Sequence, residues 1–248
     1  METMIRMARR LSTRATLMVN RVNATRPRLS RCVICLGPDQ GGGLCHACLL
    51  DLPTTAPCCQ RCALPLSIGE RGASLCRQCE RTDPPQDLSR IPWRYECPVD
   101  RMIQNYKYHG ARAQGAALAR NWLQAAGMPE PRPSVLIPAP MDPGRLRERG
   151  FNQTAELADW LGRATGIPVL AGRLQRHGGY RAQASLSRSE RRRNLREAFF
   201  VAGSALLPEH VALVEDVVTT GATAEAMGHC LRRAGVERLE VWALARTP

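Results

Sequence analysis

The 248-residue chain is poor in aromatic residues, which form 4% of it, and it contains a single lysine, Lys107. So few rings argue against an extensive groove in which nucleic-acid bases stack on aromatic side chains. We attribute the almost exclusive use of arginine to coding bias rather than to a need for forked guanidinium chemistry. The sequence has no run of about 18 apolar residues and no apolar signal-like stretch near its start. We therefore expect a soluble, cytoplasmic protein that does not span a membrane.

Positive charge is plentiful, but it is unevenly placed. The net charge of +13 and the isoelectric point near 9.9 predict an acidic partner, either nucleic acid or a phosphorylated small molecule. About half of this charge lies in residues 1–31, where eight arginines against Glu2 give +7. We interpret residues 1–31 as a disordered basic extension, so the charge says less about the rest of the chain.

Ten of the eleven cysteines precede Asp100, which indicates two unlike modules. Eight of them form four pairs at two-residue spacing, and two such pairs can bring four thiolates onto one tetrahedral Zn²⁺. We predict one site from the first two pairs and a second from the last two, although interleaved pairing and Cys58 in place of Cys59 stay open. The predicted ligands are Cys32, Cys35, Cys45 and Cys48, and then Cys59, Cys62, Cys76 and Cys79.

Two other uses of these cysteines fit less well. A disulfide framework requires an oxidising compartment, and a redox Cys-x-x-Cys motif predicts one pair rather than four. A module spanning only residues 32–85 is near the lower size limit for folding on an apolar core alone, whereas structural zinc contributes on the order of 10 kcal/mol. We therefore expect two structural zinc ions in closed sites without a catalytic role.

Residues 91–248 alternate short apolar runs with helical patterns. We expect strands at 135–138, 169–171, 199–201, 211–214 and 239–244, and helices at 151–165 and 222–234. Continuous apolar strands between amphipathic helices predict an α/β fold with a mostly parallel sheet covered by helices on both faces. In this fold class, ligands bind beyond the carboxyl ends of the strands.

One such strand end carries two adjacent carboxylates, Glu215 and Asp216, followed by a Thr-Thr-Gly turn that opens a helix. An ordinary strand-to-helix connection with a threonine cap is the simpler alternative. Two acids directly after a buried strand are, however, costly without a ligand or an ion. Carboxylates suit ribose hydroxyls and Mg²⁺, and amide and hydroxyl groups at a helix start suit a phosphate. The predicted phosphate-binding residues are Thr219, Thr220, Gly221, Ala222 and Thr223.

Residues 211–223 resemble the phosphoribosyl pyrophosphate signature of type I phosphoribosyltransferases. The four cysteine pairs, residues 149–153 (Arg-Gly-Phe-Asn-Gln), and Gln183 with Leu186 ahead of residues 193–195 extend the similarity. From residue 32 onward the chain resembles the competence protein ComF family, including its GntX-like members. The resemblance implies a type I phosphoribosyltransferase fold behind a double zinc ribbon, and a role in DNA uptake or processing.

By this resemblance Glu215 and Asp216 bind the ribose hydroxyls, and the loop from Thr219 to Thr223 binds the 5-phosphate. The loop after residues 135–140 corresponds to the one that meets pyrophosphate, and it offers Arg145, Arg147 and Arg149, although arginines in loops are more often solvated than functional. Residues 173–196 correspond to a flexible loop that closes over the reacting centre, although their arginines also suit a nucleic-acid surface. Lys107 matches a family lysine to which the sequence assigns no role.

Two functions are therefore expected. The first is an enzyme that binds phosphoribosyl pyrophosphate with Mg²⁺ and transfers phosphoribose to an unidentified base or amine, in a role linked to competence and DNA uptake. The alternative is a non-catalytic sensor of a phosphoribosyl ligand whose zinc ribbon engages single-stranded DNA or a helicase-like partner. The sequence indicates neither the acceptor nor the oligomeric state.

Overall fold

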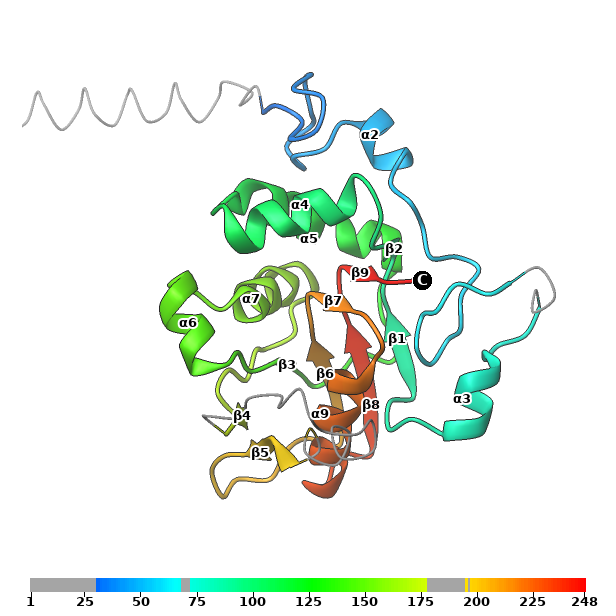
Figure 1. Cartoon of the computed structure of the whole chain (residues 1–248), viewed down its shortest axis with the longest axis vertical. Coiled ribbons are helices and arrows are strands. Elements are labelled where there is room, and N and C mark those ends of the chain that lie inside the picture. The colour runs from blue at the N-terminus through cyan, green and yellow to red at the C-terminus, as the bar shows by residue number, and fades with distance from the viewer. Residues whose placement is uncertain (1–29, 68–71, 178–194, 196) are drawn as a thin grey trace, which may run out of the picture.

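The computed structural model describes residues 30–67, 72–177, 195 and 197–248 (Figure 1). Residues 1–29 of the expected basic extension lie outside the described residues. So do residues 178–194 and 196, which make up most of the segment expected to close over the reacting centre.

The central element is a four-stranded sheet in which all neighbouring strands are parallel. Its order is β1-β8-β6-β3, and the strands are β1 (Leu88–Arg90), β3 (Val135–Pro138), β6 (His210–Val214) and β8 (Arg238–Trp242). The expected parallel sheet is confirmed. Strand β1 falls between the two predicted modules and completes one edge of the sheet by pairing with β8.

A second, three-stranded parallel sheet has the order β2-β9-β7. Its strands are β2 (Trp93–Arg94), β7 (Val217–Val218) and β9 (Ala245–Arg246). The chain passes from β6 of the first sheet to β7 of the second within Glu215 and Asp216. This step between two sheets places both acids at the carboxyl edge of the central sheet. A separate antiparallel pair joins β4 (Leu174–Arg176) and β5 (Phe199–Val201).

Helices cover both faces of the central sheet (Figure 1). Because alternate residues of a strand point to opposite sides, β3, β6 and β8 each contribute to two cores. Leu136, Val214 and Trp242 pack with α4 (Val99–Tyr108), α5 (Arg112–Ala126) and α7 (Gln153–Thr165). Ile137, Leu213 and Val241 pack with α9 (Ala222–Arg233). Among the described residues, no helix combines the length and apolar character needed to cross a bilayer.

Among the predicted elements, the helix at 151–165 and the strand at 169–171 are shorter in the structure than expected. The helix expected from residue 151 starts at Gln153, because the Asn152 side chain caps it by accepting a hydrogen bond from the Thr154 N–H at 3.0 Å. The strand expected at 169–171 is reduced to one bridge between Val169 and Leu136. Its chain turns away at Gly172, whose φ of 75° is in the left-handed region.

The cysteine-rich region forms two knuckles that pack on different parts of the sheet domain (Figure 1). The first contains α2 (His46–Leu50) and packs on α5, where Asn121 Nδ2 donates to the Gly42 carbonyl at 3.1 Å. The second contains α3 (Arg77–Thr82) and is held to β1, because Ser89 donates its N–H and hydroxyl to the Gln60 and Arg61 carbonyls at 2.8 and 2.6 Å.

Candidate functional site

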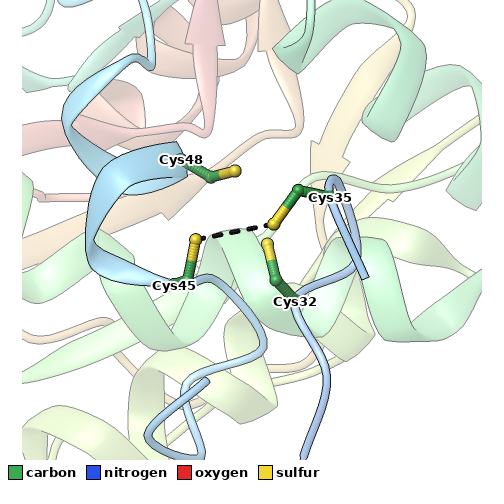
Figure 2. Close-up of side chains that lie close together, drawn as sticks. All are labelled: Cys32, Cys35, Cys45 and Cys48. Carbon is green, nitrogen blue, oxygen red and sulfur yellow. Dashed lines mark hydrogen bonds between the residues drawn. The ribbon is translucent and has the colours of Figure 1, made fainter. Parts of the chain in front are cut away.

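The eight predicted metal ligands form two separate clusters of four cysteines. Within each cluster all sulfur atoms lie within 4.8 Å of one another. Figure 2 shows the first cluster, in which Cys35 Sγ and Cys45 Sγ are 3.7 Å apart; Cys62 Sγ and Cys76 Sγ are separated by the same distance in the second. A Zn–S bond of about 2.3 Å gives a tetrahedron with edges of about 3.8 Å. Consecutive pairs therefore combine, as predicted, and Cys59 rather than Cys58 joins the second cluster.

The thiols of these clusters have unequal acidities. Burial opposes ionisation of Cys32, but the backbone N–H groups of Cys35, Cys45 and Ile34 lower its pKa to about 6. Burial raises the pKa of Cys48 and of Cys79 and raises the pKa of Cys62 to about 12. Four adjacent thiols lose their protons together only when a cation compensates the charge. Four sulfur ligands in a closed arrangement fit structural zinc and leave no position for a reacting water.

The acidic pair is held in place by the backbone of the neighbouring strand. The Glu215 N–H donates to the Trp242 carbonyl at 2.8 Å, and the Asp216 carbonyl accepts from the Leu244 N–H at 3.1 Å. Because these bonds run to the end of β8 and to the segment that links β8 to β9, the backbone of both acids is fixed between the two sheets.

Asp216 is 7% exposed, and three groups satisfy its carboxylate. Its Oδ2 lies 3.0 Å from Lys107 Nζ and accepts a hydrogen bond from Gln153 Nε2 at 2.8 Å. Its Oδ1 accepts from the Val217 N–H at 2.7 Å. Lys107, to which the sequence assigned no role, is thus the charged partner of Asp216.

Glu215 is half-buried, and among the described residues its carboxylate has no hydrogen bond or ion pair. Burial, followed by the neighbouring charge of Asp216, raises the pKa of Glu215 to about 8, while Lys107 acts in the opposite direction. The two acids are therefore unequal: one is neutralised within the protein, and the other lacks a partner.

Both acids line a cavity of about 230 Å³. Thr223 from α9 and Arg176 from β4 also line it, and Asp142, Arg145, Arg149 and Gln153 contribute further polar groups. A hollow of about 480 Å³ beside this cavity shares Lys107, Tyr108, Arg145 and Arg149 with it. The cavity thus combines paired carboxylates with cationic side chains in one lining.

The three arginines expected at a pyrophosphate lie on a short helix, α6 (Pro143–Arg149), rather than in a loop. Pro143 is at the start of this helix, and the Asp142 carboxylate accepts from the Gly144 N–H at 2.9 Å. Arg145 and Arg149 line the acid cavity, and the Arg149 guanidinium lies 4.6 Å from the centre of the Tyr108 ring. Arg147 is exposed and is not among the described residues that line the cavity.

The predicted phosphate loop connects β7 to α9. Gly221 precedes the helix with a φ of 80°, a conformation that favours glycine, and the Thr220 hydroxyl accepts a hydrogen bond from the Ala222 N–H at 3.4 Å. Thr223 faces the acid cavity, whereas Thr219, Thr220 and Ala222 line a neighbouring hollow of about 590 Å³. The loop therefore lies between two cavities, and only its last residue lines the same cavity as the acids.

Gln153 was not predicted as a site residue, although it is the last residue of the Arg-Gly-Phe-Asn-Gln motif at 149–153. In that motif Gly150 ends α6, Asn152 caps α7 and Gln153 donates to Asp216. Gln153 is 8% exposed, and its Oε1 has no hydrogen-bond partner among the described residues. Because an unsatisfied buried acceptor costs about 1–3 kcal/mol, a donor that enters the cavity would gain a hydrogen bond at this atom.

The raised pKa of Glu215 predicts an unusual pH dependence of stability. Since its folded-state pKa of about 8 exceeds the ordinary value of 4.5, the folded protein binds more protons between these values. The contribution of Glu215 to stability is therefore complete below pH 4.5 and is lost as pH rises toward 8. We compare the free energies of unfolding of Glu215→Gln and of the original protein. Between pH 5 and pH 8.5 we expect this difference to shift in favour of the variant by about 1–3 kcal/mol, after allowance for solvent. Thermal unfolding of both proteins across this range measures the effect.

The matched control is Glu148→Gln, which removes an exposed carboxylate from α6. Its stability difference from the original protein should stay constant between pH 5 and 8.5. Parallel pH profiles for the Glu215→Gln and original proteins would show that the pKa of Glu215 is not raised.

Comparison with known proteins places these features in a family. Residues 26–80 match the double zinc ribbon domain family. Competence protein F of Haemophilus influenzae is 34% identical over 226 residues, which cover 87% of this chain and 96% of that protein. DNA utilization protein YhgH of Salmonella typhi is 30% identical over 217 residues, which cover 83% and 91% of the two chains.

A purine phosphoribosyltransferase from Pyrococcus horikoshii Ot3 is 17% identical, with a TM-score of 0.31 over 60% of this chain and 82% of that one. The similarity to competence protein F is higher and spans nearly the full length of both chains. The chain belongs to the competence protein F, or ComF, family.

Proposed function

We propose that the acid cavity binds phosphoribosyl pyrophosphate together with Mg²⁺, and that the protein transfers the phosphoribosyl group to a nitrogen of a base or an amine. The observation that carries this proposal is the pair of carboxylates between the α6 arginines and the start of α9. Asp216 is oriented by Lys107 and Gln153, whereas Glu215 has no partner among the described residues. The proposed division of the chain assigns zinc to residues 32–85 and the ligand to residues 91–248.

The chemistry of the lining groups matches the parts of this ligand. Glu215 and Asp216 accept hydrogen bonds from ribose hydroxyls, and Gln153 Oε1 offers a further acceptor. The 5-phosphate is assigned to the loop from Thr219 to Thr223. The helix dipole of α9 contributes only about 0.3–2 kcal/mol, so amide and hydroxyl donors provide most of the phosphate binding.

The residues also fit a magnesium complex. Mg²⁺ is usually held by one or two carboxylates together with phosphate oxygens and waters, and Glu215 and Asp216 supply such carboxylates. When bound, the ion offsets the negative charge of the departing diphosphate. Because Glu215 holds its proton more tightly than an ordinary glutamate, binding of the cation should release a proton near neutral pH.

The protein's own contribution to the transfer is position and charge. The bond from C1 of ribose to diphosphate breaks, the bond from C1 to the acceptor nitrogen forms, and that nitrogen loses its proton. Arg145 and Arg149 line the same cavity as the acids and would bind the diphosphate as it leaves. Holding the two reactants together in the cavity lowers the entropic part of the barrier.

A second candidate is a non-catalytic protein that senses the phosphoribosyl ligand and engages single-stranded DNA. It is favoured by the hollow beside the cavity, which combines Lys107, Arg145 and Arg149 with Tyr108, a residue that is 64% exposed. The names of the two relatives, which refer to competence and DNA utilization, are consistent with a role in DNA uptake for either candidate. Pyrophosphate release with any base or amine supports the enzyme, and ligand binding without release across a broad acceptor panel supports the sensor.

A thermal-shift series tests the ligand. We expect phosphoribosyl pyrophosphate with Mg²⁺, at about 100 times its dissociation constant, to stabilise the protein by about 2.7 kcal/mol, which corresponds to a midpoint increase of about 5–11 °C. Ribose 5-phosphate, ATP and pyrophosphate serve as comparisons at equal concentration and ionic strength. Equal shifts for all four ligands, or none with phosphoribosyl pyrophosphate, would contradict the proposal.

A further inference from the structure

The second cysteine cluster lies against the proposed phosphate loop, whereas the first packs on α5. Cys62 and Cys79 of the second cluster line a cavity of about 40 Å³ together with Thr220 and Gly221 of the loop. Gln78 of α3, which lies between the ligands Cys76 and Cys79, also lines the hollow beside Thr219 and Thr220. Metal-binding and proposed ligand-binding segments are therefore neighbours at this one place.

A single buried side chain joins them. Arg246 in β9 is 7% exposed, and its Nε donates to the carbonyl of the metal ligand Cys62 at 3.0 Å. Its Nη1 donates to the carbonyls of Val218 and Thr219, the first of these at 3.3 Å, and to the carbonyl of Thr247. One planar guanidinium thus bridges the second knuckle and the first residue of the loop.

The backbone of the sheet does not make this connection by itself. The β7–β9 pairing ends where Val218 lies opposite Arg246, and Thr247 donates its N–H to the Val218 carbonyl at 3.0 Å. Beyond this point, the Arg246 side chain is what holds the Thr219 carbonyl. Because Cys62 is one of four proposed metal ligands, the position of its carbonyl depends on a closed cluster.

We propose that Arg246 is a positioning residue through which metal at the second cluster, and not at the first, orders the loop from Thr219 to Thr223. Loss of that metal releases the Cys62 segment, removes the Nε hydrogen bond and leaves the guanidinium free to turn away from Thr219. The proposed ordering of the loop does not require a bound ligand. Only its consequence for phosphoribosyl pyrophosphate affinity rests on the function proposed above.

Hydrogen–deuterium exchange of the full-length, zinc-loaded protein tests the ordering without a ligand. We expect Arg246→Gln to raise the exchange rate of amides in residues 219–223 at least tenfold, while amides of β6 stay protected and zinc remains at two per chain. Arg246→Lys should also raise it, because one ammonium group cannot reach both Cys62 and Thr219 as a fork does. The control Arg238→Gln removes an arginine of β8 whose side chain is 42% exposed, and it should leave exchange of the loop unchanged.

A second pair of variants separates the two metal sites. Cys62→Ser and Cys35→Ser should each lower zinc from two to one per chain, but only Cys62→Ser should speed exchange of residues 219–223. If Cys62→Ser fails to fold, gradual chelation of the original protein provides the same comparison, with loop exchange followed against zinc released. Unchanged loop exchange in Arg246→Gln, or equal effects of Cys62→Ser and Cys35→Ser, would overturn the proposal.

Ligand titration then connects the ordering to affinity. If the original protein binds phosphoribosyl pyrophosphate with Mg²⁺, Arg246→Gln should weaken binding about tenfold, whereas equal affinities would overturn this part of the inference. If the original protein does not bind this ligand, the proposed function fails, while the exchange measurements still decide the role of Arg246.

Discussion

Asp216→Asn is expected to weaken binding of phosphoribosyl pyrophosphate with Mg²⁺ at least 100-fold. Asparagine keeps the shape of the side chain but removes the negative charge that a magnesium complex and the ribose hydroxyls would use. A hydrogen bond to a charged group contributes about 1.5–3 kcal/mol, so the loss of the one acceptor position that Lys107, Gln153 and Val217 leave free, together with the attraction to Mg²⁺, corresponds to about 100-fold or more. Isothermal titration at fixed Mg²⁺ and ionic strength measures the change. An affinity within threefold of the original would show that Asp216 does not contact the ligand.

This variant must be separated from a general loss of stability, because Lys107 would be left as a half-buried cation without its partner. Removing one member of a buried ion pair is more destabilising than removing both. Lys107→Met combined with Asp216→Asn should therefore unfold at a higher temperature than Asp216→Asn alone, while binding stays weak. Asp159→Asn, which removes an exposed carboxylate from α7, is the charge-matched control and should leave both properties unchanged.

The central sheet could be predicted because its strands carry their own signals. Residues 135–138 and 211–214 are continuous apolar runs, as expected for strands buried on both faces, and both were placed correctly. Strand β1 could not be recognised, because Leu88, Ser89 and Arg90 gain their sheet position from pairing with β8 rather than from apolar character. Helix α5 was also missed. Its many alanines and its glycine are small, so the periodic pattern of large apolar residues that marks a helix face is weak. Gly115 is required where a Cβ would come within 2.7 Å of the Tyr106 ring.

The sequence predicted the local motifs of the candidate site but not the contacts between residues that lie far apart in the chain. Adjacent acids at a strand end and regularly spaced cysteines are local patterns, so Glu215, Asp216 and both metal clusters could be read directly. Lys107 and Gln153 meet at Asp216 from two different helices, although they lie 109 and 63 residues from it. Contacts between residues so far apart leave no local pattern in the sequence. The link from Arg246 to Cys62 spans 184 residues and is hidden for the same reason.

Zinc removal is expected to have the largest effect on stability. The first cluster packs into the main core through Cys32, Leu44 and Leu52, but the core around the second consists mainly of its own cysteines with a few leucines. Structural zinc contributes on the order of 10 kcal/mol in small zinc domains, and this energy is also folding energy. A loss of only about 5 kcal/mol would lower the unfolding midpoint of a chain of this size by about 10–20 °C. Calorimetry of the original protein before and after chelation measures this shift.

The two metal ions should also leave in a fixed order. Cys35 of the first cluster is exposed and two of its partners are partly so, whereas three cysteines of the second cluster are buried. A chelator reaches exposed thiolates first, so the first cluster should lose its zinc faster. Native mass spectrometry should then detect a one-zinc species, in which Cys35 and Cys45 react with a thiol reagent before Cys59 and Cys76. Simultaneous loss of both ions would mean that the two knuckles unfold together, despite their contacts with different parts of the sheet domain.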